Sequence, residues 1–418
     1  MGLFTLVTSA ELLLNGMMIL SQFLGGYTPL AEYQAFQEHY RDPIRQFLPP
    51  DSDFYRMEKQ EFRTYNDPLG LGFPGISHFS STASVRQTEF LKRLGFNCYA
   101  TWCTYEGATS AADALLRIRY EFGPSGKQDS LAVKDEIWQH PAQFPLFFFV
   151  KEDFVRYDFM AETGALTRQN DLLQLLRDQE GPDFFEEIPV RVTATENLAP
   201  DEDDKYTRIE PEKPAFADIQ ITPEAGKSLY FFLPGASLNV TVTVNGDVLM
   251  NGSRDYAPFP ICLDAYGKEG PVTVRVELLK ETLEGGFLAY TLDTGRLAFL
   301  AESVNAAAPL MERIGETAFR LKTDAADEDR LVVSSIPFDA GWRVKAGGKQ
   351  LPLKMIHESV LGFVLPAGCD LAEVSYRAYG QEAGMIMSGL SGFLWLILLF
   401  FEQKFDKPGS GSLIRKKL

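Results

Sequence analysis

Residues 383–401 read AGMIMSGLSGFLWLILLFF and contain no charged side chain. Because an α-helix rises about 1.5 Å per residue, roughly 20 such residues cross a bilayer core about 30 Å thick. Apolar runs of this length are unusual in the helices of soluble proteins. The stretch therefore predicts a transmembrane helix at 383–401. The alternative is a buried helix of a soluble protein.

The segment that follows, 402–418, is basic. It contains two acidic residues, Glu402 and Asp406, and a larger set of lysines and arginines: Lys404, Lys407, Arg415, Lys416 and Lys417. Positively charged residues that flank a span tend to stay in the cytoplasm. We expect 402–418 to be a cytoplasmic tail and everything immediately before the span to lie outside the cytoplasm.

A second apolar stretch opens the chain. Residues 3–24 read LFTLVTSAELLLNGMMILSQFL, and the polar residues Glu11 and Asn15 share one helical face. Polar groups at membrane depth usually face other helices or a wet cavity. No basic residue precedes the run, unlike a signal peptide. We predict that 1–24 is a transmembrane helix, the last of a larger bundle whose earlier helices are missing. An interfacial or partly buried helix is the alternative.

Composition narrows the classes of partner. The chain has 418 residues, with 40 Lys and Arg against 57 Asp and Glu, which gives a net charge of −17. An acidic surface repels phosphate backbones, so nucleic acid is excluded as a partner. The cysteines Cys98, Cys103, Cys262 and Cys369 allow disulfides in an exported domain, but we favour unpaired buried thiols. The sequence contains no CxxC pair and no Cys/His cluster, so it does not predict a metal site.

Between the two spans, residues 25–197 predict a mixed α/β domain. A helix begins after Ser84 and ends at Gly95. A short helix over 113–116 passes into the strand pattern RIRYEF, and another helix covers 168–178. The run FFFV at 147–150 predicts a short apolar strand.

The acidic segment 198–214 predicts a solvated linker. Residues 215–378 then give short strand signals separated by the turn dipeptides Asn245-Gly246 and Gly347-Gly348. This pattern is typical of an antiparallel β-sandwich or jelly roll, as one β domain or two small ones. The predicted fold class is thus a membrane-anchored α+β protein, with both external domains flanked by an N-terminal and a C-terminal transmembrane helix.

One loop and one tryptophan are candidates for substrate binding. Arg63, Tyr65, Asn66 and Asp67 combine an aromatic ring with amide and charged groups, as sugar-binding sites do. Asn-Asp-Pro is also an ordinary turn sequence, and that interpretation is the stronger one. Trp342 could be a stacking platform, although a buried anchor of a sandwich is at least as good an interpretation.

Several short pieces in order carry a resemblance to a known family. They are FYRME at 54–58, YNDP at 65–68, GIS at 75–77, FSS at 79–81, FLKRLG at 90–95, DALLRIRY at 113–120, RQNDLL at 168–173, IPFDAGW at 336–342, LGF at 361–363 and PAG at 366–368. Together with the polar pair Glu11 and Asn15, this ordered set resembles the YfhO family of bacterial membrane proteins. The resemblance spans nearly the whole chain.

The resemblance implies a function. YfhO-like proteins look like membrane glycosyltransferases of the C-type fold, which take a sugar from a polyprenyl-phosphate carrier outside the cytoplasm. They transfer it to a cell-envelope glycan, for some members a polymer of the teichoic-acid type. Catalysis in such enzymes uses a carboxylate near the first external loop of the membrane bundle, often with a divalent metal.

The multi-helix catalytic part has no counterpart in this sequence, so the resemblance transfers no catalytic residue and no cofactor to it. The expected partners are the lipid bilayer, a missing or separate multi-span bundle, and an envelope glycan or polyprenyl-linked sugar. The expected place is the bacterial cell membrane. The first alternative is a membrane-anchored, non-catalytic module that binds glycans or assists envelope assembly. A second is a purely structural domain that shields a transporter-like bundle.

Overall fold

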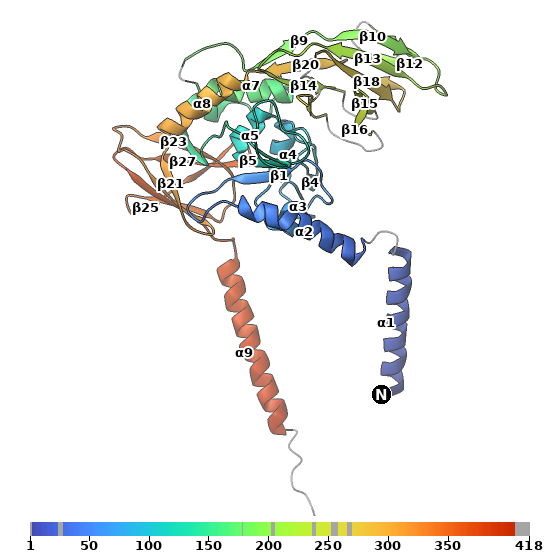
Figure 1. Ribbon diagram of the computed structural model, residues 1–418. Coiled ribbons are helices and arrows are strands. Elements are labelled where there is room, and N and C mark those ends of the chain that lie inside the picture. Colours follow the sequence, from blue (N-terminus) through green and yellow to red (C-terminus); the bar gives the residue numbers. More distant parts are fainter. Residues whose placement is uncertain are drawn as a thin grey trace, which may run out of the picture.

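The computed structural model describes residues 2–23, 28–177, 179–201, 205–235, 240–251, 258–265 and 270–405. It is a mixed α+β structure with many antiparallel sheets and one long apolar helix near the C-terminus (Figure 1). In the described residues the helices are α1 (Gly2–Phe23), α2 (Leu30–Gln46), α3 (Asp67–Leu71), α4 (Val85–Arg93), α5 (Ser110–Leu116), α6 (Glu152–Arg156), α7 (Ala165–Leu175), α8 (Thr294–Ala307) and α9 (Gln381–Phe405).

The N-terminal body, residues 28–177, contains α2 to α7 and two small sheets. The first sheet has the order β1-β5-β7-β6, in which β1 and β5 are parallel and the other neighbours antiparallel. The second has the order β2-β4-β3. The strands are β1 (Arg56–Lys59), β2 (His78–Phe79), β3 (Cys98–Tyr99), β4 (Trp102–Cys103), β5 (Ile118–Phe122), β6 (Leu131–Lys134) and β7 (Ile137–Gln139).

The β lobe packs on the end of this body that lies away from α1 and α9 (Figure 1). Its sheets have the orders β10-β13-β18-β15-β16, β17-β14-β20-β9 and β11-β12-β19. The strands are β9 (Phe185–Ile188), β10 (Arg191–Glu196), β11 (Leu198–Pro200), β12 (Tyr206–Arg208), β13 (Phe216–Ile221), β14 (Ser228–Phe232), β15 (Val240–Val244), β16 (Asp247–Met250), β17 (Ile261–Cys262), β18 (Val272–Leu278), β19 (Thr282–Leu283) and β20 (Leu288–Leu292).

The C-terminal lobe connects to α9. Its sheets have the orders β21-β22-β28-β24-β25 and β26-β27-β23-β8. The strands are β8 (Phe147–Val150), β21 (Leu310–Gly315), β22 (Ala318–Lys322), β23 (Arg330–Pro337), β24 (Trp342–Ala346), β25 (Lys349–Leu351), β26 (Leu353–Ile356), β27 (Val360–Leu365) and β28 (Leu371–Tyr376). The region predicted as one or two β units thus holds two separate hydrophobic clusters, one in each lobe.

The segment 198–214 differs from its prediction as a solvated linker. It contains β11 and β12, which pair with each other, and β12 also pairs with β19. Leu198 and Tyr206 are buried in the core of the β lobe. The segment is not a solvated linker because these two apolar side chains are buried. They belong to a short amphipathic hairpin, which the many charged residues around them made hard to recognise in the sequence.

Strand pairing also crosses the predicted boundary between the two external domains. β9 and β10, from the first predicted domain, pair with β20 and β13 of the β lobe. β8 pairs with β23 of the C-terminal lobe. The polypeptide therefore interleaves the N-terminal body with both lobes.

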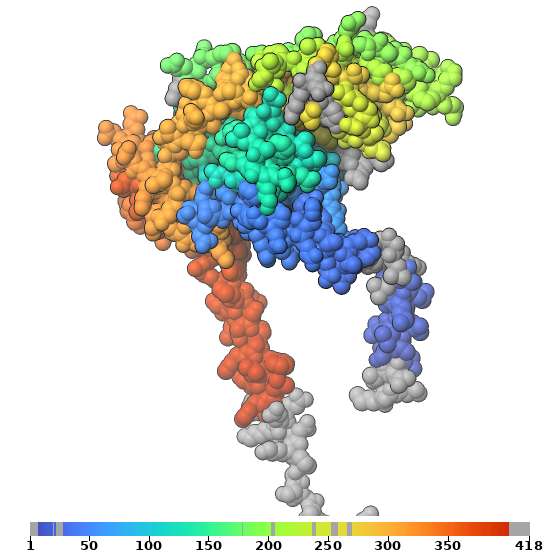
Figure 2. All heavy atoms as spheres, viewed as in Figure 1, coloured from blue at the N-terminus to red at the C-terminus, as the bar shows by residue number. Residues whose placement is uncertain are grey.

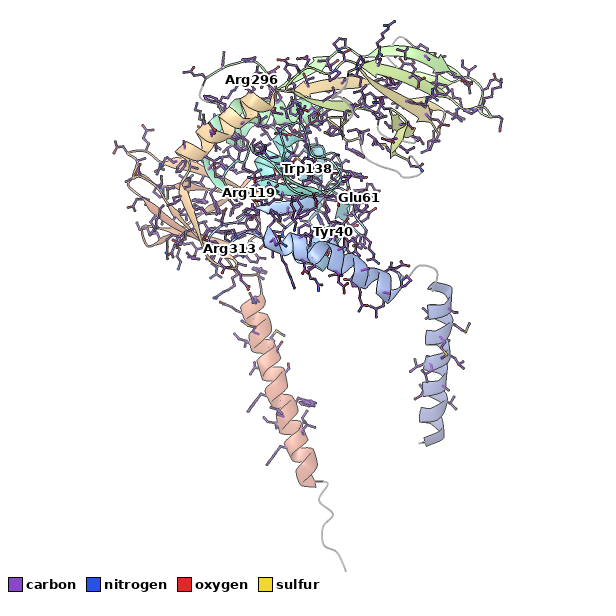
Figure 3. All side chains as sticks on the ribbon, viewed as in Figure 1. Tyr40, Glu61, Arg119, Trp138, Arg296 and Arg313 are labelled. Atoms are coloured by element: carbon purple, nitrogen blue, oxygen red, sulfur yellow. A yellow bond between two sulfur atoms is a disulfide. The ribbon has the colours of Figure 1, made fainter. Side chains whose placement is uncertain are left out.

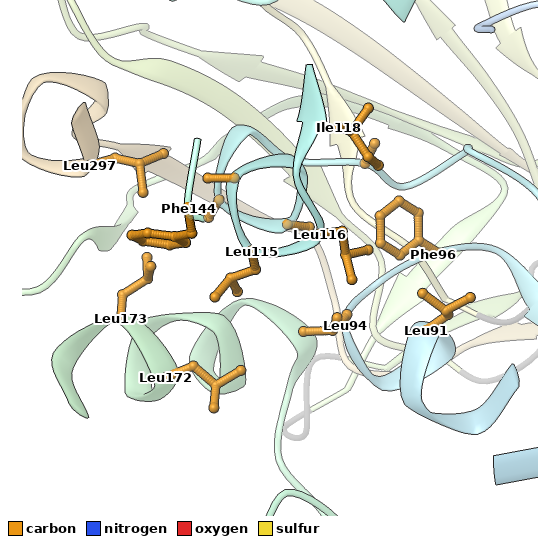
Figure 4. Close-up of a cluster of buried hydrophobic side chains, with 14 of the residues drawn as sticks. Leu91, Leu94, Phe96, Leu115, Leu116, Ile118, Phe144, Leu172, Leu173 and Leu297 are labelled. Atoms are coloured by element: carbon orange, nitrogen blue, oxygen red, sulfur yellow. The ribbon is translucent and has the colours of Figure 1, made fainter. Parts of the chain in front are cut away.

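The core of the N-terminal body surrounds α5, all of whose residues are buried (Figure 4). Leu115 and Leu116 of this helix meet Leu94 after α4 and Leu172 of α7 in one cluster. Thr109 caps the helix by accepting a hydrogen bond from the Ala112 amide at 3.0 Å. This tight packing fixes the position of every side chain that α5 carries, including one acidic residue.

α9 is the one helix in the described residues that is long and apolar enough to cross a membrane, over Gln381–Phe400. None of that window is buried within the protein. α1 contributes a shorter apolar stretch, Val7–Ile19. Figures 1 and 2 show both helices extending from the same side of the body.

Candidate functional site

A cleft of about 570 Å³ lies between the N-terminal body and the β lobe. One wall comes from the β lobe, at 248–251 and 259–262, and the other from the body, at 60–61, 105–108, 121 and 124–127. We call this space the central cleft. Figure 3 places Glu61, on its rim, on the part of the body beneath the β lobe.

Beneath the cleft lies a group of five buried polar side chains that we call the buried ionic network. Its members come from different elements and are each at most 7% exposed: Tyr105, Asp113, Glu121, Lys127 and His140. Of these, Tyr105, Glu121 and Lys127 line the cleft. The network therefore joins the core around α5 to the surface of the cleft.

The ammonium group of Lys127 is at the centre of the network. Its Nζ atom lies 2.9 Å from Asp113 Oδ2 and 2.9 Å from Glu121 Oε2. It also donates a hydrogen bond to the Tyr105 hydroxyl at 2.9 Å. Its three N–H donors thus have one partner each, which satisfies a buried lysine.

The remaining members complete the set of contacts. The Tyr105 hydroxyl donates to the Asp113 carboxylate, with 3.1 Å to each oxygen. His140 Nε2 lies 3.2 Å from Glu121 Oε2, and His140 Nδ1 lies 3.1 Å from the Ser130 hydroxyl. Partners on every side hold these charges in a fixed geometry.

Local structure brings the two carboxylates together. Asp113 lies on the buried helix α5, which ends at Arg117 in a left-handed conformation, with φ of 55°. The chain then enters β5, an inner strand of its sheet, where Glu121 is buried opposite Glu58 of β1. This sharp step from helix to strand turns both acids towards Lys127.

The charges of the network determine its chemistry. Burial raises the pKa of Glu121, but Lys127 and His140 outweigh it, so that pKa lies below its usual range. Burial lowers the pKa of Lys127, but Asp113 and Glu121 raise it well above normal. An acid held ionised is a weak base and a lysine held protonated is a weak nucleophile. The network is suited to binding and positioning rather than to proton transfer.

Burial has the dominant effect on the pKa values of Asp113 and Tyr105. It raises the pKa of Asp113, although Lys127 and His140 oppose the rise. Burial and the charge of Asp113 raise the pKa of the Tyr105 hydroxyl well above its ordinary value. Tyr105 therefore remains a hydrogen-bond donor at all physiological pH values.

Three members, Asp113, Glu121 and His140, place ligand atoms within 4.8 Å of one another, which is metal-like spacing. However, the Lys127 ammonium lies between the two carboxylates and already supplies a positive charge. A divalent cation at the same point would meet it at close range, with strong repulsion in a buried site. The donor set therefore fits a protein cation and not a metal.

The loop predicted to bind sugar is held by internal contacts. Asp67 is 5% exposed, pairs with Lys59 Nζ at 3.2 Å, and accepts hydrogen bonds from the amides of Arg63 and Thr64. Asn66 accepts from the amide of Phe79 and donates to its carbonyl, at 2.8 and 3.1 Å. Asn66 and Asp67 thus act as structural turn residues.

The other predicted binding residues have different surroundings. The ring of Tyr65 stacks on Trp102 with 5.0 Å between centroids and an interplanar angle of 16°. The guanidinium of the exposed Arg63 lies over the rings of Tyr33 and Phe36. Trp342 packs on Tyr376 in the C-terminal lobe and donates its indole N–H to Pro337. The structure therefore does not bring Trp342 into the same cluster as the loop.

The polar pair of the N-terminal helix and the cysteines can also be placed. Glu11 and Asn15 lie on α1, and both are exposed. A disulfide joins Cys98 to Cys103, so the prediction of unpaired thiols is wrong for these two. Their strands β3 and β4 are adjacent in a hairpin, which brings the two sulfur atoms together. Cys262 and Cys369 are free.

Sequence patterns alone do not indicate the buried ionic network as a site. Asp113 lies within the DALLRIRY piece at 113–120, but nothing in the spacing of Glu121, Lys127 and His140 indicates convergence. One feature of the sequence could have indicated the network. Its charged residues occur in segments whose pattern otherwise predicts a helix or a strand. Such charges require partners once they are buried.

Comparison with known proteins gave one extensive match and several weak ones. No curated protein matches the chain. Similar solved structures include a beta-glycosidase from Bacteroides vulgatus, with 13% identity, a TM-score of 0.19, and coverage of 37% of this chain and 21% of that chain. Another is the arabinofuranosyltransferase AftD from Mycobacteria, with 12% identity, a TM-score of 0.16, and coverage of 38% and 12%.

A beta-glucuronidase from Ruminococcus gnavus has 9% identity, a TM-score of 0.16, and coverage of 40% of this chain and 29% of that chain. The chain thus spans less than a third of the length of these structures. TM-scores of this size carry no argument about fold or function. In contrast, the family described as "Bacterial membrane protein YfhO" matches residues 1–388. This chain therefore belongs to the YfhO family of bacterial membrane proteins.

Proposed function

We propose that this chain is the extracytoplasmic part of a membrane glycosyltransferase of the C-type fold and that its central cleft binds the glycan. Such an enzyme would glycosylate a cell-envelope glycan or teichoic-acid-type polymer from a polyprenyl-phosphate sugar. The observation that carries the proposal is the cleft itself, with a fixed set of hydrogen-bonding groups at its base. Membership of the YfhO family supports the membrane setting.

The lining of the cleft is suited to a sugar. The exposed lining residue Glu61 offers carboxylate oxygens as acceptors, and the exposed Asn251 offers an amide that both donates and accepts, so sugar hydroxyls can use both. Phe259 and Met250 add apolar surface to the opposite wall. Ligand sites commonly combine an apolar wall with a few polar groups that fix orientation.

The net negative charge of the residues that line the cleft favours binding of an uncharged sugar over binding of a phosphate. Among the described lining residues, three are acidic, Glu61, Glu106 and Glu121, and one is basic. That basic residue, Lys127, is already paired with two carboxylates. We infer that the cleft holds the neutral sugar units of an acceptor rather than the phosphate of a lipid carrier.

Sequence and structure both support an extracytoplasmic position for the folded region. Basic residues follow α9 in the sequence, and basic flanks tend to remain in the cytoplasm. The Cys98–Cys103 disulfide is typical of proteins that leave the reducing cytoplasm. We further propose that α1 and α9 both cross the membrane and that the two main sheets of the β lobe form a β-sandwich.

A binding experiment tests this function. The full chain in lipid nanodiscs is titrated with soluble six-unit fragments of envelope glycans. Asn251→Trp places a bulky ring at the exposed mouth of the cleft, and Asp247→Trp, at the exposed start of β16 and outside the cleft lining, is the control. We expect Asn251→Trp to weaken binding at least tenfold and Asp247→Trp to leave it unchanged. Binding of no fragment, or equal binding by both variants, would contradict the proposal.

The loop residues Arg63, Tyr65, Asn66 and Asp67, with Trp342, remain proposed binding residues of lower rank, because most of their polar atoms have protein partners. Transfer of a labelled sugar from polyprenyl phosphate, in native membranes that contain the chain together with its multi-span partner, would distinguish the glycosyltransferase from a module that only binds glycan. That module is favoured by the network, whose charges suit binding better than proton transfer.

A further inference from the structure

The small sheet β2-β4-β3 has two chemically different faces. Its register pairs Phe79 with Trp102 and Tyr99 with Trp102, and it pairs Cys98 with Cys103. Side chains alternate between faces along a strand, so the three aromatic rings share one face and the cysteines share the other. The cysteine face is buried, whereas the aromatic face is turned outward.

This outward face carries more aromatic surface than a solvated sheet requires. Tyr99 is 63% exposed and Phe79 is 48% exposed. Trp102 lies between them in the register and stacks against Tyr65. We call these four residues, Tyr65, Phe79, Tyr99 and Trp102, the aromatic platform. Two exposed rings beside two half-buried ones form an aromatic patch of the kind that often marks a binding surface.

A disulfide and two hydrogen bonds fix the backbone that carries the platform. The Cys98–Cys103 disulfide connects the two strands that carry Tyr99 and Trp102. The side chain of Asn66 brackets the backbone of Phe79 with two hydrogen bonds. A ligand would therefore meet rings that are already ordered, so little conformational entropy is lost on binding.

A series of neighbouring residues connects the platform to the rim of the central cleft. Glu61 lines the cleft, and the next residue, Phe62, packs its ring against Tyr65 at 5.5 Å between centroids. Tyr65 in turn stacks on Trp102. A single path of contacts thus leads from the rim of the cleft to the platform.

We propose that the aromatic platform is a second binding subsite, which stacks on the pyranose rings of a glycan whose other end lies in the central cleft. This inference rests on the proposed glycan-binding function. Aromatic rings stack on the apolar faces of sugars, and a row of rings can hold several units of one extended chain. The ligand is therefore an oligosaccharide or polymer and not a single sugar.

A lipid surface is the competing occupant, and charge disfavours it. Aromatic patches that bind membranes are usually accompanied by lysines or arginines that meet anionic headgroups. At the junction with the cleft the charged residues are Glu61 and Glu106, both acidic. The nearby Arg63 directs its guanidinium over Tyr33 and Phe36.

The test compares ligands of two lengths on the full chain in lipid nanodiscs. The probes are six-unit fragments of envelope glycans, peptidoglycan strands and teichoic-acid-type polymers, each with its own monosaccharide. The variants are Tyr99→Ala and Phe79→Ala, both at exposed positions. The matched control is Phe299→Ala, because Phe299 is 72% exposed on α8, outside the platform.

We expect Tyr99→Ala and Phe79→Ala each to weaken binding of the six-unit fragment about tenfold, equivalent to about 1.4 kcal/mol. Binding of the monosaccharide, and both affinities of Phe299→Ala, should not change. Wild-type binding of a fragment that neither platform variant weakens would overturn the platform alone. Failure of the wild type to bind any fragment or monosaccharide would instead overturn the proposed function.

A second readout separates glycan from lipid. A polarity-sensitive fluorophore attached to Phe79→Cys, in nanodiscs and in a background where the free Cys262 and Cys369 are replaced by serine, should report an aqueous environment that becomes less polar on addition of the six-unit fragment. A lipid-like signal before glycan is added would overturn the proposal in favour of membrane contact.

Discussion

The Nζ atom of Lys127 lies 2.9 Å from the Oε2 atom of Glu121, and both side chains are buried at the base of the central cleft. The same nitrogen lies equally close to Asp113. One ammonium group therefore compensates two carboxylates that belong to different elements.

Replacement of Lys127 by methionine should destabilise the protein strongly. The change removes the positive charge and leaves Asp113 and Glu121 buried beside each other. Breaking a buried ion pair from one side costs roughly 3–5 kcal/mol. Denaturant unfolding of the full chain in detergent, followed by circular dichroism, measures the change in the free energy of unfolding.

The triple variant Lys127→Met, Asp113→Asn, Glu121→Gln is the control for this experiment, because it removes both uncompensated charges. It should recover much of the lost stability. A single Lys127→Met variant within about 1 kcal/mol of wild type would show that the network is not the buried ion pair described here.

Charge reversal at Glu61 should change the selectivity of the cleft. Glu61 is exposed on the rim, so Glu61→Lys should leave the fold intact while it reduces the repulsion of anions. We expect a phosphate-bearing glycan to bind about fivefold more tightly in low salt, with no change for its neutral counterpart. Isothermal titration of both ligands checks this.

Glu302, exposed on α8, gives the matched control Glu302→Lys, with the same change in net charge away from the cleft. An equal gain in affinity for the phosphate-bearing glycan in this control would attribute the effect to net charge. The proposed charge selectivity of the cleft would then be wrong.

Glu58 should make the protein less stable as pH rises. Burial raises the pKa of Glu58 to about 7 from 4.5, although Ile76 and Ser77 donate hydrogen bonds to its carboxyl group. A raised pKa favours folding below pH 4.5, and that contribution is lost as pH rises to about 7. The loss is on the order of 3 kcal/mol.

Glu58→Gln should remove this dependence, because an amide does not titrate. The difference in unfolding free energy between Glu58→Gln and wild type should shift in favour of the variant between pH 4.5 and pH 7. Thermal or denaturant unfolding at a series of pH values measures it. A difference that stays constant across this range would rule out the raised pKa.

His357, in contrast, should make the protein less stable as pH falls. Burial lowers its pKa to about 4 from 6.5, among the rings of Phe154 and Phe159. A neutral buried histidine contributes fully above pH 6.5, and that contribution is lost as pH falls to about 4. The loss is again on the order of 3 kcal/mol.

His357→Gln should keep a donor for the Phe154 carbonyl, which lies 2.7 Å from Nε2 of the histidine, and should not titrate. Relative to wild type, its unfolding free energy should improve as pH falls from 6.5 to 4, from a baseline lowered by the lost ring contacts. Nuclear magnetic resonance titration of the His357 ring provides a direct check. A ring that titrates near 6.5 would contradict the prediction.

The sequence by itself determined the features that depend on neighbouring residues. The apolar run at 383–401 specifies the long helix α9 because hydropathy and length suffice for it. Asn245 and Gly246 both adopt positive φ in the predicted hairpin turn, as do Gly347 and Gly348. The helix and strand on either side of Arg117 also follow from local pattern.

Only the tertiary structure decided which distant segments meet. The buried ionic network combines residues from 105 to 140 that no spacing rule relates, because their contacts depend on how α5 packs and how β5 pairs. The hairpin at β11 and β12 and the Cys98–Cys103 disulfide likewise depend on strand pairing. Strand pairing and packing depend on contacts between residues that are far apart in the sequence. They are determined by the burial of apolar surface and by the need of buried charges for partners, so local sequence patterns do not predict them.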